Sequence, residues 1–260
     1  MFEAGNADLW MLEPARGVLT RLTTSPRLEF LARWTPDGRR LAFVGEDRVF
    51  DLYWMPADGS APPELLRTSD YDKYPGSWSP DGRAFLYTET HTTTRENIWL
   101  LDVTGSKEAR PLIVTPFLES GPEFSPDGRW FAFMSNESGR VEVYIAPLAN
   151  PSAKTRISTA GGTEPSWAPD GRRLFYRSGD RLMSVDLGTG PAPAPGEARP
   201  LFAAETIADG WQSFRNYDPA ADGRRFVIVD QGGAGATPIP LHVILNWFTD
   251  LDRRLPAARR

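Results

Sequence analysis

The carboxylates that recur along the chain are the first residues whose types and spacing suggest chemistry. Five aspartates each precede a glycine in copies of one stretch, "WTPDGRRLAF", and they are Asp37, Asp81, Asp127, Asp170 and Asp222. Two carboxylates that share acid and base catalysis must lie about 5 to 9.5 Å apart. Equivalent residues of successive repeats lie in separate structural units. We therefore expect these aspartates to shape turns and not to catalyse.

Other catalytic and metal-binding patterns find little support in the sequence. The two histidines, His91 and His242, lack the spacing of zinc ligands, and the chain has no cysteine. No G-x-S-x-G motif supplies the serine of a catalytic triad. The oxygen-rich segments "SDYDKY" and "NESGRVE" do not match a twelve-residue calcium loop. The sequence thus predicts no enzymatic activity, no catalytic residue, no metal and no cofactor.

The glycines that follow the aspartates reveal the period of the repeat. They are Gly38, Gly82, Gly128, Gly171 and Gly223, separated by 44, 46, 43 and 52 residues. A period of about 40 to 45 residues is typical of a propeller blade with four strands. The longest interval contains a proline-rich segment, residues 188–200.

Each unit divides into four short pieces with the alternation of β-strands. In the second unit these are "GSW", "RAFLYTE", "NIWLLD" and "RPLIVT", separated by turn residues. In the repeated turn, Pro presets φ, Asp accepts hydrogen bonds from nearby backbone N–H groups, and Gly accepts a positive φ. The turn residues are Pro36, Asp37, Gly38, Pro80, Asp81, Gly82, Pro126, Asp127, Gly128, Pro169, Asp170, Gly171, Asp222 and Gly223.

The repeat also resembles a known family. It resembles the TolB-type, WD-repeat-like β-propeller repeat. The shared pattern begins with P-x-W-S-P-D-G, continues with an acidic or amide residue before an apolar and an aromatic one, and closes with L-T. "DLYWM" (51–55) and "NIWLL" (97–101) carry the third-strand part of it. The same repeat occurs in propellers of tricorn-like and prolyl-oligopeptidase-like peptidases. The segments "RLMSVDL", "NYDPAADGRRFVIV" and "LHVILNWFTDLDRRLP" further resemble the end of propellers found behind bacterial serine/threonine kinases or winged-helix regulators.

These observations predict an all-β propeller of four-stranded antiparallel blades over residues 1–245. The repeats begin near residues 33, 77, 123, 166 and 214, residues 1–25 supply partial blade strands, and residues 246–260 form a tail with a short helix. The ring has five blades if residues 18–23 complete the last one as its outer strand. Otherwise it is an incomplete ring of six. Open edge strands would favour a dimer.

A ligand would bind at the mouth of the central channel, where the loops entering the inner strands converge. These loops offer Tyr71, Tyr74, Phe117, Glu119, Glu164, Trp211 and Arg215. Their mixture of aromatic and charged groups suits a peptide or a small polar ligand, and a purely capping role fits equally well. Glu119 and Glu164 are the unrepeated carboxylates that a channel hydrolase, such as a glycosidase, would need.

The composition of the chain limits the classes of partner that it is expected to bind. A net charge of −5 argues against nucleic acid, and no apolar run approaches the length of a membrane span. No signal peptide is visible, so we expect a cytoplasmic protein unless it is attached to a larger, membrane-anchored one. The expected function is a non-enzymatic protein-interaction or ligand-sensing module, from the C-terminal part of a larger bacterial signalling protein or a relative of one. The alternatives are a propeller that accompanies a peptidase or other hydrolase, and a propeller hydrolase.

Overall fold

All regular elements in the described part of the structure are β-strands, so the all-β prediction is confirmed. The computed structural model describes residues 2–3, 6–13, 16–105, 107–190, 192–203 and 215–228. The predicted tail and helix of residues 246–260 lie outside these ranges, as do Trp211 and His242. In the described ranges no helix has the length and hydropathy needed to cross a membrane.

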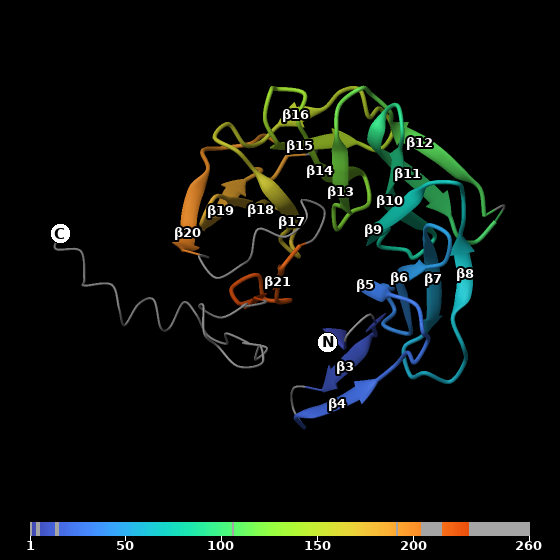
Figure 1. The fold of residues 1–260 in the computed structure, drawn as a ribbon. Helices are drawn as coiled ribbons and strands as arrows, with labels where there is room; N and C mark the ends of the chain where they lie inside the picture. The colour runs from blue at the N-terminus through green and yellow to red at the C-terminus, as the bar shows by residue number, and fades with distance from the viewer. Residues whose placement is uncertain are drawn as a thin grey trace.

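Four complete antiparallel sheets, each with four strands in chain order, form an arc around a common centre (Figure 1). We number them sheets 1 to 4. Sheet 1 has β5 (Glu29–Trp34), β6 (Arg40–Glu46), β7 (Phe50–Pro56) and β8 (Glu64–Arg67). Sheet 2 has β9 (Asp72–Trp78), β10 (Ala84–His91), β11 (Arg95–Asp102) and β12 (Ala109–Ile113). Sheet 3 has β13 (Glu119–Phe124), β14 (Trp130–Ser135), β15 (Glu142–Pro147) and β16 (Thr155–Arg156). Sheet 4 has β17 (Thr163–Trp167), β18 (Arg173–Ser178), β19 (Arg181–Asp186) and β20 (Arg199–Ala203).

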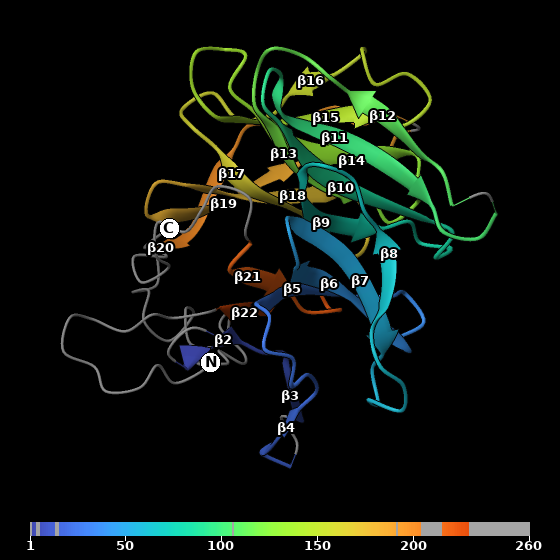
Figure 2. The ribbon, with the colours of Figure 1, turned by 45° about the vertical axis from the view of Figure 1, so that its right-hand side comes forward.

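Two-stranded sheets lie at both ends of this arc (Figure 2). They pair β1 (Phe2–Glu3) with β2 (Asn6–Ala7), β3 (Trp10–Glu13) with β4 (Val18–Arg21), and β21 (Tyr217–Pro219) with β22 (Phe226–Ile228). Among the described strands β4 pairs with β3. The segment that would form the rest of the last blade lies outside the described residues, so ring closure through residues 18–23 stays a prediction. The number of blades and the dimer both stay predictions.

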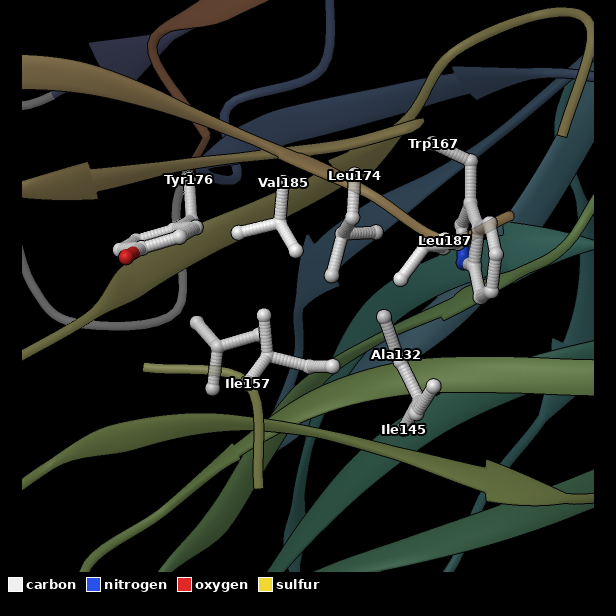
Figure 3. Close-up of a cluster of buried hydrophobic side chains, with 9 residues drawn as sticks. Ala132, Ile145, Ile157, Trp167, Leu174, Tyr176, Val185 and Leu187 are labelled. Carbon is white, nitrogen blue, oxygen red and sulfur yellow. The ribbon is translucent and has the colours of Figure 1, made fainter. Parts of the chain in front are cut away.

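The hydrophobic core lies between consecutive sheets. Figure 3 shows one such layer, in which Ala132, Ile145 and Ile157 from sheet 3 and the segment that follows it face Leu174 and Val185 from sheet 4. Equivalent clusters join sheets 1 and 2, sheets 2 and 3, and sheet 4 with β21 and β22. The alternating apolar residues that predicted strands are therefore the residues that hold neighbouring sheets together.

The repeated turns use their aspartates internally. Each Oδ1 accepts a hydrogen bond from the backbone N–H two residues further on, at 2.9 to 3.1 Å in Asp37, Asp81, Asp127, Asp170 and Asp222. The Thr35 hydroxyl adds a second bond and holds the pKa of Asp37 below its usual value. The turn glycines have φ between 60° and 70°, the left-handed region that glycine tolerates best.

The innermost strand of each sheet contains a β-bulge at the same place in the repeat. The register skips between Phe30 and Arg33 in β5, between Pro75 and Trp78 in β9, between Ser120 and Glu123 in β13, and between Thr163 and Ser166 in β17. Glycine and proline in "YPG", "SGP" and "TEP" fit this irregularity, since both residues weaken a regular ladder. Residues of all four bulges line one cavity between the sheets.

Candidate functional site

The bulges surround a small central cavity of about 50 Å³. Its polar lining consists of Arg33, Ser77, Glu123, Glu164 and Arg215, and the remainder is Met134 with the glycines and prolines of the bulges. Four different sequence repeats and the segment before β21 therefore meet at one point. In the described part of the chain, polar side chains from several repeats meet at this cavity, and we take it as the candidate binding site.

Three of these residues occupy one position of the repeat. Arg33, Ser77 and Glu123 each come directly before the aromatic residue that opens the turn. The turns and core residues around them are nearly invariant from copy to copy, whereas this position carries a cation in the first copy, a carboxylate in the third, and a serine in the second and fourth, Ser77 and Ser166. The scaffold is thus repeated and the cavity chemistry is not, which is the arrangement expected of a specific binding site.

Glu123 anchors one side of the cavity. Its Oε1 accepts hydrogen bonds from the Trp167 backbone N–H at 3.1 Å and from the Ser166 hydroxyl at 3.3 Å. Its other oxygen forms an ion pair with Arg215, which also pairs with Asp218. The positive charge of Arg215 is therefore balanced by the largely buried Glu123 and by Asp218, whose side chain is 68% exposed.

Glu164 lies at a strained backbone position and has its own partners. Its φ is 55°, and its Oε1 forms an ion pair with Arg177 at 2.9 Å. The Asn216 backbone N–H donates to its Oε2 at 2.9 Å, and the Tyr217 hydroxyl donates to its backbone oxygen at 2.7 Å. Burial raises the pKa of Glu164 despite these donors. Its bonds hold Asn216 and Tyr217, at the start of β21, against sheet 4.

Arg33 is a second cation of the cavity and, unlike Arg215, donates its hydrogen bonds to backbone carbonyl oxygens. Its Nε donates to the Gly76 carbonyl at 3.0 Å and one terminal nitrogen donates to the Ala32 carbonyl at 3.2 Å. Burial and then the charge of Arg215 lower its pKa to about 10, while the charge of Asp218 acts in the other direction. No carboxylate of the described residues forms an ion pair with it.

The other residues predicted at the channel mouth do not line this cavity. The Tyr71 ring stacks on His91 with centroids 4.0 Å apart, and the Tyr74 ring lies edge-on to Phe50 at 5.9 Å. Burial raises the pKa of Tyr74 to about 12. Phe117 is 41% exposed, away from the cavity lining. Of the predicted set, the structure brings together Glu164 and Arg215.

Glu119 is fully buried and not open to a ligand. Its Oε1 accepts hydrogen bonds from the Thr115 hydroxyl at 2.6 Å and the Ser135 hydroxyl at 3.3 Å. Among the described residues, Glu119 and Glu164 have no hydrogen-bond or ion-pair partner in common. The described residues also contain no group of three His, Cys, Asp or Glu placed to hold a metal ion.

Sequence reasoning missed Arg33, Ser77 and Glu123. A signal was present, because aligning the copies on the turn aromatic shows that the preceding residue varies in charge while its neighbours do not. That signal identifies residues of the cavity only when the positions of the β-bulges are known, because the bulges decide which side of the sheet a residue faces. In a regular strand, two successive residues would face opposite sides of the sheet.

A comparison with protein families identifies the fold. The sequence model of the TolB β-propeller domain matches residues 45–182, more than half of the chain. The chain belongs to this family. The TolB-type resemblance of the repeat is thereby confirmed, and the sheets described above are blades of a TolB-type propeller.

This TolB-type propeller spans less than two thirds of the length of each of three proteins to which it is similar. It is 28% identical over 187 residues to the uncharacterized protein Atu1656 of Agrobacterium fabrum, covering 67% of this chain and 62% of that one. It is 26% identical over 168 residues to the uncharacterized peptidase YuxL of Bacillus subtilis, covering 50% of this chain and 25% of YuxL. The crystal structure of TolB from Acinetobacter baumannii superposes with a TM-score of 0.70 at 19% identity, covering 87% of this chain and 54% of TolB.

The buried carboxylate of Glu119 in this propeller gives a testable pH dependence. We expect Glu119→Gln to stabilise the protein at pH 7 by on the order of 1 kcal/mol, because a buried amide is less costly than a buried charge. Burial raises the pKa of Glu119 above 4.5, against the opposing effect of the Thr115 hydroxyl. The folded state therefore holds this proton more tightly than the unfolded chain, and the wild type loses stability as the pH rises from about 4.5 through the folded pKa.

Thermal unfolding at about pH 4 and at pH 7 measures this difference. The gain in the variant should be present at pH 7 and should shrink toward the acidic end of the range. Glu197→Gln, at an exposed position, serves as the matched control and should show no gain at either pH. An equal gain at both pH values would show that ionisation of Glu119 is not the cause.

Proposed function

We propose that this TolB-type propeller is a non-enzymatic interaction module that binds a peptide or protein partner at its central cavity. The observation that carries the proposal is the change of charge at one position of an otherwise repeated scaffold, where Arg33, Ser77 and Glu123 line the cavity. Their chemistry suits recognition through hydrogen bonds and charge. As part of the same proposal, the module belongs to a larger bacterial signalling protein, in line with the resemblance of its last repeat.

A second candidate is a propeller that works beside a peptidase or other hydrolase. The observation favouring it is the similarity to a quarter of the length of YuxL, which is named as a peptidase. The coding sequence next to this one separates the two candidates. A kinase or DNA-binding domain there supports the signalling module, whereas a hydrolase domain supports the second candidate.

The role of the cavity is tested with a bound peptide and a double variant. A peptide is first selected from a random display library on the immobilised full chain, and its Kd is measured by calorimetry. We expect Glu123→Gln combined with Arg215→Gln to weaken that affinity about tenfold, or about 1.4 kcal/mol. Both members of the ion pair are replaced together because Arg215→Gln alone would leave the largely buried Glu123 carboxylate without its cation.

Arg156→Gln is the matched control, because Arg156 lies exposed on β16 at the outer edge of sheet 3. It should bind the peptide as tightly as the wild type. If the double variant folds like the wild type and also binds with unchanged affinity, the binding site lies elsewhere on the propeller and the proposal is wrong.

A further inference from the structure

Among the described residues, Arg33 is a cation of the central cavity that forms no ion pair. Arg215 pairs with Glu123 and Asp218, and Arg177 pairs with Glu164. Arg33 makes its hydrogen bonds to two backbone carbonyls instead. Both described carboxylates that line the cavity, Glu123 and Glu164, are therefore already paired with another arginine.

The surroundings of Arg33 make an added anion favourable. A guanidinium removed from water without an ion-pair partner loses solvation that two carbonyl groups restore only in part. The neighbouring positive charge of Arg215 adds repulsion, which is one of the causes that lower the pKa of Arg33. At pH 7 Arg33 remains charged, since that pKa is about 10. An anion entering the cavity would relieve both penalties.

The size and the donors of the cavity indicate which anion fits. Its volume of about 50 Å³ admits a group of a few atoms and not a whole residue. A planar guanidinium matches the two oxygens of a carboxylate. The Ser77 hydroxyl, which also lines the cavity, accepts a hydrogen bond from the Phe124 N–H at 2.7 Å and keeps its own hydrogen available for donation.

We propose that Arg33 and Ser77 bind the carboxylate group of a partner peptide that enters the central cavity of the propeller. The carboxylate belongs to an aspartate or glutamate side chain or to a free C-terminus, which share this chemistry. The inference rests on the proposed function, because it names the group that the interaction module recognises. It assigns to Arg33 the role of pairing with the ligand, while the Glu123–Arg215 pair shapes the opposite side of the cavity.

Acetate is the probe that tests the site without a known partner. Binding of ¹³C-labelled acetate to the full chain is followed by NMR titration, with acetamide as the uncharged analogue. We expect saturable acetate binding that Arg33→Gln weakens at least about tenfold, corresponding to about 1.4 kcal/mol. Arg156→Gln should leave it unchanged, and acetamide should not bind. Equal acetate binding by wild type and Arg33→Gln, or no saturable binding by the wild type, would overturn the proposal.

A second variant keeps the test decisive if Arg33→Gln does not fold. Ser77→Asp places a carboxylate beside Arg33 within the protein and retains an acceptor for the Phe124 N–H. We expect it to abolish acetate binding and to raise the thermal midpoint, because the guanidinium gains an internal partner. A Ser77→Asp protein that binds acetate like the wild type would contradict the assignment.

Peptides distinguish the two sources of the carboxylate. A short alanine peptide with a free C-terminus is compared with its C-terminal amide and with an amidated peptide that contains one internal glutamate. Tighter binding of the free acid identifies a C-terminus, and binding of the glutamate peptide identifies a side chain. Inorganic phosphate that binds Arg33 more tightly than acetate would overturn the carboxylate class.

The outcomes separate this inference from the function on which it rests. Peptide affinity that depends on the Glu123–Arg215 pair but not on Arg33 would leave the interaction module standing and remove the carboxylate site. Acetate binding that depends on Arg33, with peptide binding located elsewhere, would retain the anion site and remove the proposed function.

Discussion

Replacing Lys73 by methionine is expected to lower the free energy of unfolding by about 3 to 5 kcal/mol. The Lys73 side chain is fully buried in β9, where its ammonium group forms an ion pair with Asp51 at 2.8 Å. It also donates a hydrogen bond to the Tyr71 carbonyl at 2.5 Å. Methionine fills a similar volume, so the effect reports the lost charge and not a cavity.

The size of the effect comes from the carboxylate that would remain. Asp51 is 6% exposed in β7, and without Lys73 it would retain the Thr68 hydroxyl at 3.1 Å as its side-chain donor. A buried charge that loses its partner costs far more than the intact pair contributes. Because β7 and β9 belong to different sheets, the lost bond also weakens the contact between sheets 1 and 2.

Urea unfolding of the wild type and the variant measures this difference. Lys73→Met combined with Asp51→Asn should recover part of the loss, since the second change removes the stranded charge. Arg48→Met is the matched control, because its ion pair with Asp70 has side chains that are 74% and 80% exposed. That variant should unfold like the wild type. A loss for Lys73→Met no larger than for the control would refute the explanation.

The sequence was sufficient for the parts of the fold that local chemistry decides. The turn that contains Asp37 and Gly38 is specified by adjacent residues, because a side chain bonds the backbone two residues away and a glycine takes a positive φ. The strands follow from alternation over a few residues, and the period of the turns gives the order of the sheets. Because these features repeat, a wrong strand or turn assignment in one copy can be recognised by comparing it with the other copies.

The site depended on contacts that are distant in the sequence. Glu119 was predicted at the channel mouth, yet the Ser135 hydroxyl of the next strand binds it inside sheet 3. Arg33 was overlooked because a bulge changes which residues face the centre, and the Gly76 carbonyl that it contacts lies in another repeat. The closure of the ring likewise depends on which distant strands pair, a choice that the pattern of β4 does not determine.

Gly76→Ala is expected to destabilise the propeller by about 3 kcal/mol, at the upper end of the range for overpacking. A Cβ atom at this position would lie 2.4 Å from the Pro122 backbone oxygen and 2.8 Å from the Leu86 backbone oxygen. One of these oxygens belongs to the inner strand of sheet 3 and the other to the strand paired with β9. Neither is the end of a flexible side chain, so the backbone itself must move.

Thermal and urea unfolding should both show the loss, while Gly196→Ala, whose added Cβ would meet the Asp186 oxygen at an ordinary 3.5 Å, should behave like the wild type. The same movement should disturb the cavity, because the Gly76 carbonyl accepts the Arg33 Nε hydrogen bond at 3.0 Å. Weaker acetate binding in folded Gly76→Ala protein is therefore expected. Unchanged stability would mean that sheets 2 and 3 can move apart at the centre without loss of stability. Close packing would then fail to explain the glycine in this inner strand.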